Sequence, residues 1–119
     1  VEMEAVYAEE QPRIAGVFLK RVEIGMPIQS DTTIQYILGA QKETITFKDT
    51  EIDNPYNTYQ NFGLPPGPIG SPSLSAIQAV LEPEQTDYLY FVAQNDGHHR
   101  FSRTYAEHLR AIDEIYYGR

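Results

Sequence analysis

An aromatic and β-branched run near the C-terminal end constrains the fold of this chain most strongly. Residues 88–93 read Tyr-Leu-Tyr-Phe-Val-Ala, and side chains of this kind favour a strand over a helix. Asn95, Asp96 and Gly97 follow as a turn sequence, and residues 99–102 can return as the second strand of a hairpin. Because the run is almost continuously apolar, we expect its strand to be central, buried and covered on both faces.

Gly and Pro divide the first part of the chain into short helical segments. One helix is expected to end near Glu9 and a second to begin near Gln11, because Pro12 is tolerated in a first helical turn. Gly25 is suited to ending the second helix, since glycine readily adopts the left-handed backbone that follows many helices.

Capping residues mark the later helices. Asp31 is expected to cap a helix over 32–38 that ends at Gly39. Ser73 and Thr104 each precede an apolar stretch of helical spacing, and both are predicted to cap the helix that follows. Together with the hairpin, these helices predict a single small domain of the α+β class, in which a short sheet is packed by helices.

Composition narrows the classes of partner. The chain has 119 residues, 41% of them hydrophobic, and a formal net charge of -8 at pH 7, as expected of one globular domain with an acidic surface. That charge argues against nucleic acid as a partner and against adhesion to an anionic membrane surface. No apolar stretch reaches the about 20 residues of a membrane span, so we expect a chain that is not inserted in a membrane.

Neither a metal nor a cofactor is expected. Cysteine is absent, which removes disulfides, thiolate catalysis and cysteine-ligated zinc. The spacing of His98, His99 and His108 matches no familiar zinc motif. The glycines within residues 63–70 do not precede a helix in the manner of a phosphate-binding loop, which argues against nucleotide binding.

Four stretches of the chain carry a resemblance to a known family. They are VEMEA at 1–5, GMPIQSDTT at 25–33, YNTY at 56–59 with GLPPGPI at 63–69, and TDYLYFVA at 86–93 with the Gly97, His99, Phe101, Ser102, Thr104, Glu107 and His108 that follow it. In this order and spacing the chain resembles the C-terminal catalytic region of the endolytic murein transglycosylases, the YceG-like family. It departs from the family pattern at Met3, where a basic residue is usual, and at Thr32, where Pro is usual.

The resemblance implies an enzyme, a lyase that cleaves the MurNAc–GlcNAc bond of peptidoglycan glycan strands and leaves 1,6-anhydroMurNAc ends during cell-wall synthesis and remodelling. Residues 1–119 would be the catalytic region, truncated at its N-terminus and without the family's membrane anchor and LysM-like part. The implied location is the extracytoplasmic face of the bacterial cytoplasmic membrane, with a single-pass anchor on the parent protein and a soluble fragment. The resemblance implies that the protein binds peptidoglycan glycan strands. Cell-wall synthases are possible further partners of the parent protein.

By the match at residues 1–5, the resemblance implies that Glu2 is the catalytic residue. One carboxyl group can protonate the glycosidic oxygen and then, as a base, take the proton of the C6 hydroxyl that attacks C1. Because this nucleophile belongs to the sugar, the second carboxylate of ordinary glycosidases is not required. The residues alone leave Glu2 and Glu4 open, since acidic residues are common in a first helical turn for electrostatic reasons.

A polar turn within the second motif is a candidate for sugar binding. Gln29, Ser30 and Asp31 carry amide, hydroxyl and carboxylate groups that can hydrogen-bond the hydroxyl and N-acetyl groups of the glycan. The alternative is that Asp31 is only a helix cap and Gln29 only a surface residue. Both roles are compatible, because a cap fixes the turn that presents Gln29.

The third motif adds aromatic side chains and an amide. Tyr56, Asn57 and Tyr59 offer the groups that hold a pyranose ring and its acetamido substituent, although ordinary loop packing with an Asn turn is the alternative. His99 is expected to reach the same cleft from the hairpin. We expect the turn at 29–31 and this loop to converge on one concave surface near the first helix.

A function of a different class stays open. The chain can be a non-catalytic peptidoglycan-binding module that keeps the cleft but lacks effective catalysis because its catalytic helix is truncated. The release of anhydro-sugar ends from glycan strands distinguishes the enzyme from the binding module.

Overall fold

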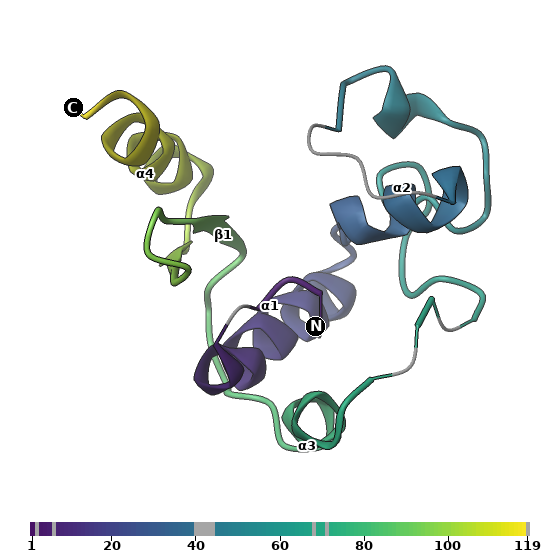
Figure 1. Ribbon diagram of the computed structural model, residues 1–119, viewed down its shortest axis with the longest axis horizontal. Helices are drawn as coiled ribbons and strands as arrows, with labels where there is room; N and C mark the ends of the chain where they lie inside the picture. Colours follow the sequence, from purple (N-terminus) through teal and green to yellow (C-terminus); the bar gives the residue numbers. More distant parts are fainter. Residues whose placement is uncertain (2, 6, 40–44, 68, 71, 119) are drawn as a thin grey trace. The chain divides into compact units, whose positions relative to one another are not determined.

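The computed structural model describes most of the chain, namely residues 1, 3–5, 7–39, 45–67, 69–70 and 72–118 (Figure 1). Within these residues the elements in chain order are η1 (Ala8–Glu10), α1 (Gln11–Ile24), α2 (Asp31–Leu38), η2 (Asp49–Glu51), α3 (Leu74–Leu81), β1 (Tyr90–Ala93), β2 (His99–Ser102) and α4 (Tyr105–Tyr117). None of the helices in the described part of the chain has the length and apolar character of a membrane span. The predicted α+β class, a short antiparallel sheet with helices, is confirmed.

The chain divides into two compact units. The first combines Val1–Lys20 with Pro72–Arg119, and it holds η1, most of α1, α3, the sheet and α4. The second is Arg21–Ser71, and it holds the end of α1, α2 and η2. The units are described separately below.

The sheet of the first unit is the predicted hairpin, with a shorter first strand. β1 and β2 are antiparallel, and Tyr90 lies opposite Ser102 at one end of the register. The strand begins at Tyr90 rather than at residue 88, although the backbone N–H of Leu89 still donates to the carbonyl of Ser102 at 3.0 Å. Gly97, with φ of 89°, adopts the left-handed conformation that the turn requires.

The expected cover on both faces of β1 is confirmed, but the expected central, buried position is wrong. Phe91 meets Phe18 of α1 edge to face at 5.6 Å, and Tyr90 stacks on His108 of α4 at 5.1 Å. Helix α4 contacts both strands. Ala93 is exposed and the rest of β1 is half-buried. The reason is that a sheet of two strands has no central strand, so each strand keeps one open edge.

The start of α1 matches the prediction, whereas the helix expected before it is wrong. α1 begins at Gln11 and ends ahead of Gly25, whose φ of 75° is left-handed. Among the described residues before it, only Ala8–Glu10 are helical, as one turn of 3-10 helix. Glu10 instead directs its carboxylate to His99 of β2, a contact between residues 89 positions apart that local sequence does not reveal.

The cap of α2 is displaced by one residue from its predicted position. Ser30 occupies the N-cap and Asp31 is the first residue of the helix, where a negative charge is still favourable next to the helix N-terminus. The predicted end at Gly39 is confirmed, with φ of 72°.

The two later caps are confirmed. The hydroxyl of Ser73 accepts from the backbone N–H of Ala76 at 3.3 Å at the start of α3. The hydroxyl of Thr104 accepts from the backbone N–H of Glu107 at 3.1 Å at the start of α4. Both caps satisfy a backbone donor that the first helical turn leaves without an intrahelical partner.

One face of α1 packs so closely on the segment before β1 that only glycine fits. Ile14 and Val17 are fully buried on this helix, and the carbonyl of Pro12 accepts from the backbone N–H of Glu84 at 3.0 Å. A Cβ atom built on Gly16 would overlap the backbone oxygen of Glu84 and lie 3.1 Å from a methyl group of Thr86. The missing side chain at this position therefore sets how closely the two segments approach.

We expect Gly16→Ala to destabilise the protein by about 1–3 kcal/mol, the usual range for overpacking, even though alanine is the better helix former. Urea unfolding followed by circular dichroism measures this free energy of unfolding. Glu23→Ala, on an exposed position of the same helix, is the control and should change stability by less than about 0.5 kcal/mol. Equal stability of the two variants would contradict the close packing.

Candidate functional site

In the second unit, the structure brings two of the sequence motifs together. The backbone N–H of Gln29 donates to the carbonyl of Thr58 at 3.2 Å, and the backbone N–H of Ser30 donates to the hydroxyl of Thr58 at 2.9 Å. The turn at residues 29–31 and the loop at 56–59 are therefore adjacent, although they are separated by almost thirty positions in the sequence. Thr58 joins them, and it was not among the predicted site residues.

Gln29 is exposed and has an uncommon backbone conformation. Its φ is 54°, and no other non-glycine residue in the described part of the chain has a positive φ. This conformation disfavours side chains with a Cβ atom and persists only where neighbouring contacts hold it. The hydrogen bonds from the backbone N–H groups of Gln29 and Ser30 to Thr58 stabilise this conformation, so the exposed Gln29 side chain extends from a fixed backbone.

Ser30, by contrast, lies inside the turn. It is 7% exposed, and its hydroxyl is 2.7 Å from that of Thr32. Its carbonyl accepts from the hydroxyl of Thr33 at 2.7 Å, and this hydroxyl is 2.9 Å from that of Thr58. The hydroxyls of Thr33 and Thr58 and the backbone carbonyl of Ser30 thus form a buried hydrogen-bond network beneath this segment.

Asp31 and Tyr59 form a polar pair across the two motifs. The hydroxyl of Tyr59 donates to the exposed carboxylate of Asp31. Burial raises the pKa of Tyr59 well above its usual value, and the hydrogen bond and negative charge of Asp31 raise it further, against a smaller opposing effect of the Arg21 cation. Tyr59 therefore stays a neutral donor, and the second oxygen of Asp31 keeps its capacity to accept hydrogen bonds from a ligand.

Arg21 is a buried cation that the sequence analysis did not single out. It is 6% exposed in the last turn of α1, and its guanidinium donates to the carbonyl of Ile28 just before the turn at 29–31. A basic residue in the last turn of a helix is so common that its position alone offered no signal.

Tyr56 lies half-buried beside a second aromatic ring. Its ring centroid is 5.0 Å from that of Tyr36 on α2, with the planes at 39°. Tyr36 is 46% exposed. A Cβ atom on Gly67 would lie 3.0 Å from the Tyr56 hydroxyl, which places Gly67 of the third motif next to this side chain. Tyr36 was also missed, and its only signal in the sequence was an aromatic residue on the polar side of a short helix.

Asn57 is placed inside its loop rather than on the surface. It is 0% exposed, and its amide nitrogen donates to the carbonyls of Thr50 and Ile52 at 3.1 and 2.7 Å. Its amide oxygen accepts from the backbone N–H of Tyr59 at 2.9 Å. In this arrangement the side chain bridges two segments of the loop and uses both ends of its amide to do so.

In the first unit, the predicted residue His99 is paired with a carboxylate. Its Nδ1 lies 3.0 Å from Oε1 of Glu10, and the two side chains are 6% and 10% exposed. Glu2, the implied catalytic residue, lies outside the described residues. The competing Glu4 is described, and its side chain is 11% exposed.

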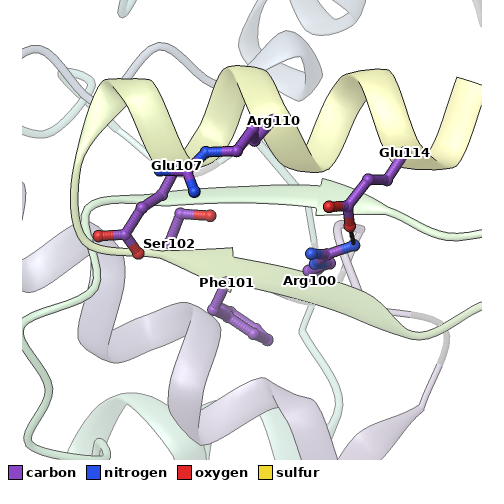
Figure 2. A pocket seen from close by; sticks show the side chains of 6 residues that line it. All are labelled: Arg100, Phe101, Ser102, Glu107, Arg110 and Glu114. Carbon is purple, nitrogen blue, oxygen red and sulfur yellow. Dashed lines mark ion pairs between the residues drawn. The ribbon is translucent and has the colours of Figure 1, made fainter. Parts of the chain in front are cut away.

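A hollow of about 400 Å³ lies between β2 and α4 of the first unit (Figure 2). It is lined by Arg100, Phe101, Ser102, Glu107, Arg110 and Glu114. Figure 2 shows Arg100 paired with Glu114, and Phe101 directed to the side of the strand away from the helix. None of the predicted site residues lines this hollow. No group of three potential metal ligands of the His, Cys, Asp or Glu type occurs in the described part of the chain.

The burial of Asn57 generates a prediction on stability. Asn57→Ala should destabilise the protein by about 1–3 kcal/mol, because two carbonyls and one N–H lose their buried partner. Asn61→Ala is the matched control: its amide also donates to backbone carbonyls, but from an exposed side chain that water can replace. Urea unfolding of both variants measures the difference, and a larger loss for Asn61→Ala would show that Asn57 is not the main brace of the loop.

Comparison with known proteins places the chain in a family. The YceG-like family profile matches residues 1–114. The chain is 45% identical over 114 residues to the endolytic murein transglycosylase of Bacillus subtilis and 40% identical over 120 residues to that of Streptococcus pneumoniae D39, and each match covers 96% of this chain. It spans only 32% and 22% of those relatives.

A solved structure is also similar. The crystal structure of a YceG-like protein from Listeria monocytogenes aligns with a TM-score of 0.88 and 46% identity, covering 92% of this chain and 36% of that one. An identity of this size, over nearly the whole chain and with the same arrangement of the backbone, is not a likeness of fold alone. The chain belongs to the YceG-like family.

Proposed function

We propose that this chain is part of the catalytic region of an endolytic lytic transglycosylase, an enzyme that cleaves the MurNAc–GlcNAc bond of peptidoglycan glycan strands. The observation that carries the proposal is the 45% identity to the endolytic murein transglycosylase of Bacillus subtilis over 96% of the chain. Because the chain spans 32% of that relative, the activity of the whole protein is part of the proposal. The buried network and exposed polar groups of the second unit support it as a built surface for a polar ligand.

The proposed reaction needs one acid that becomes a base. Glu2 protonates the glycosidic oxygen, and the leaving GlcNAc departs. The resulting carboxylate then takes the proton of the C6 hydroxyl, whose oxygen attacks C1 and closes the 1,6-anhydro ring. No water is consumed, so the chemistry differs from that of hydrolases, which place two carboxylates across the scissile bond.

Exposed groups of the second unit are proposed to bind the glycan. Gln29 projects from a fixed turn and can exchange hydrogen bonds with an acetamido group. Asp31 accepts from sugar hydroxyls through the carboxylate that Tyr59 already orients. The partly exposed rings of Tyr36 and Tyr56 provide the apolar surface on which a pyranose ring packs.

Ser30 and Asn57 contribute to binding indirectly in this proposal. Both side chains are buried and hydrogen-bonded within the protein, so their role is to hold the segments that carry the exposed groups. A fixed loop loses little conformational entropy when the glycan binds, which raises affinity without an added contact.

Peptidoglycan as the substrate sets the proposed location. The substrate lies outside the cytoplasmic membrane, so the protein acts on the extracytoplasmic side. We further propose that the parent protein is held at the outer face of that membrane and works beside the cell-wall synthases, whose new glycan strands are the material it cuts.

The catalytic role of Glu2 is tested in a chain extended with the residues that precede the matched region in the Bacillus relative. Glu2→Gln should lower the release of anhydroMurNAc-ended fragments by about 10²–10⁴-fold, because the amide is nearly isosteric but cannot supply a proton. Mass spectrometry of digested glycan strands measures the products, and circular dichroism checks the fold.

Glu4→Gln is the matched control for this experiment, because the same substitution removes the competing carboxyl group two positions along the chain. It should retain most of the activity. Near-normal cleavage by Glu2→Gln would overturn the assignment and make Glu4 the first candidate. Glycan binding without anhydro ends in the unaltered extended chain would instead favour a binding module over an enzyme.

A further inference from the structure

A buried carboxylate that the proposed reaction does not use lies against His99. Glu10 is 9% exposed on η1, and its Oε1 and Oε2 atoms are 3.0 and 2.9 Å from the backbone nitrogen of His99. Oε1 is also 3.0 Å from Nδ1 of the His99 ring. One carboxylate therefore meets both the backbone and the side chain of a single residue on β2.

This contact determines which ring nitrogen carries the proton. An ionised carboxylate has no hydrogen to give, so both the backbone nitrogen and Nδ1 of His99 must donate to Glu10. In the neutral ring, a proton on Nδ1 leaves Nε2 as a hydrogen-bond acceptor. The geometry thus selects one of the two tautomers of His99.

The neighbours of His99 hold its ring in place. Phe91 meets it edge to face at 5.4 Å, and Phe101 lies at 6.4 Å. The segment that carries Glu10 is tied to the same hairpin at two further points: the hydroxyl of Tyr7 donates to the carbonyl of Asp96 at 2.9 Å, and its ring stacks on that of His98 at 4.1 Å. Rotation of the His99 ring is therefore restricted on several sides.

We propose that Glu10 is a positioning residue for glycan recognition: it fixes the Nδ1–H tautomer of His99, so that Nε2 accepts a hydrogen bond from a hydroxyl or N–H group of the glycan strand. The inference rests on the proposed function, because the ligand is the glycan. Only 6% of the His99 side chain is exposed, and the proposal assigns this exposed part to Nε2.

Replacement of Glu10 by Gln makes a sharp test of this role. A carboxylate presents two acceptor oxygens, whereas an amide presents one oxygen and one NH₂ group. If the amide oxygen of the new side chain still accepts the hydrogen bond from the backbone N–H of His99, its NH₂ group faces Nδ1. Nδ1 must then become a hydrogen-bond acceptor. The proton moves to Nε2, and the atom that faces the ligand changes from acceptor to donor while the shape of the side chain is preserved.

The tautomer is read by long-range ¹H–¹⁵N correlation spectra of the ¹⁵N-labelled 119-residue chain, above the pH at which the ring is protonated. The unaltered chain should show a protonated Nδ1 and a bare Nε2 at His99, and Glu10→Gln should show the reverse or a mixture. Glu9→Gln is the matched control, because Glu9 contacts His98 and not the His99 ring. An unchanged tautomer in Glu10→Gln would overturn the proposal.

Ligand binding tests the second half of the proposal with soluble, uncrosslinked MurNAc–GlcNAc oligosaccharides. Glu10→Gln and His99→Phe should each weaken affinity roughly 5- to 10-fold, as expected for one lost hydrogen bond, and Glu9→Gln should not. The double variant Glu10→Gln/His99→Phe should bind no more weakly than His99→Phe alone, because Glu10 acts only through His99. The spectra of each variant confirm that it is folded.

The outcomes separate this inference from the proposed function. If the unaltered chain binds the oligosaccharides but Glu10→Gln binds equally well, or if the double variant is weaker than His99→Phe alone, Glu10 does not act through His99 and the inference is overturned. If the unaltered chain binds no glycan and the extended chain releases no anhydro ends, the proposed function itself fails, and glycan recognition through His99 fails with it.

Discussion

Thr58 supplies the interaction on which the candidate site depends. Its hydroxyl and carbonyl together receive the backbone N–H groups of two consecutive residues, Gln29 and Ser30, and its hydroxyl also meets that of Thr33 at the first turn of α2. A buried hydroxyl that is left without partners costs free energy, so this arrangement favours one geometry of the turn over its alternatives. Every site side chain of the second unit that faces solvent depends on the segments joined there.

Some residues of these motifs support the candidate binding surface from inside the protein, and others are exposed on that surface. Ser30 and Asn57 are buried with their polar groups satisfied, whereas Gln29 and Asp31 are exposed. Adjacent positions in this short segment thus have opposite roles, since Ser30 is buried and its two neighbours are exposed. The positive φ of Gln29 is the uncommon backbone conformation within this segment.

The hairpin of the first unit has a comparable division between its faces. Tyr90 turns toward α4, while Phe91 and His99 lie on the side that receives α1 and Glu10. The hairpin therefore joins the beginning of the described chain to its last helix. A contact across 89 positions has a large entropic cost of closure, which the buried charge–dipole contacts of Glu10 and the aromatic packing offset.

Local chemistry determined what the sequence alone could predict: the hairpin turn at Gly97, the caps Ser73 and Thr104, and the family motifs, because each depends on residues within a few positions of one another. Tertiary contacts decided the rest. The pairing of Glu10 with a distant strand depends on a partner 89 positions away, and the inward position of Asn57 follows from carbonyls that only the folded loop brings within reach. Propensity and spacing carry no information on such partners, since a side chain is buried or exposed according to what the rest of the chain places beside it.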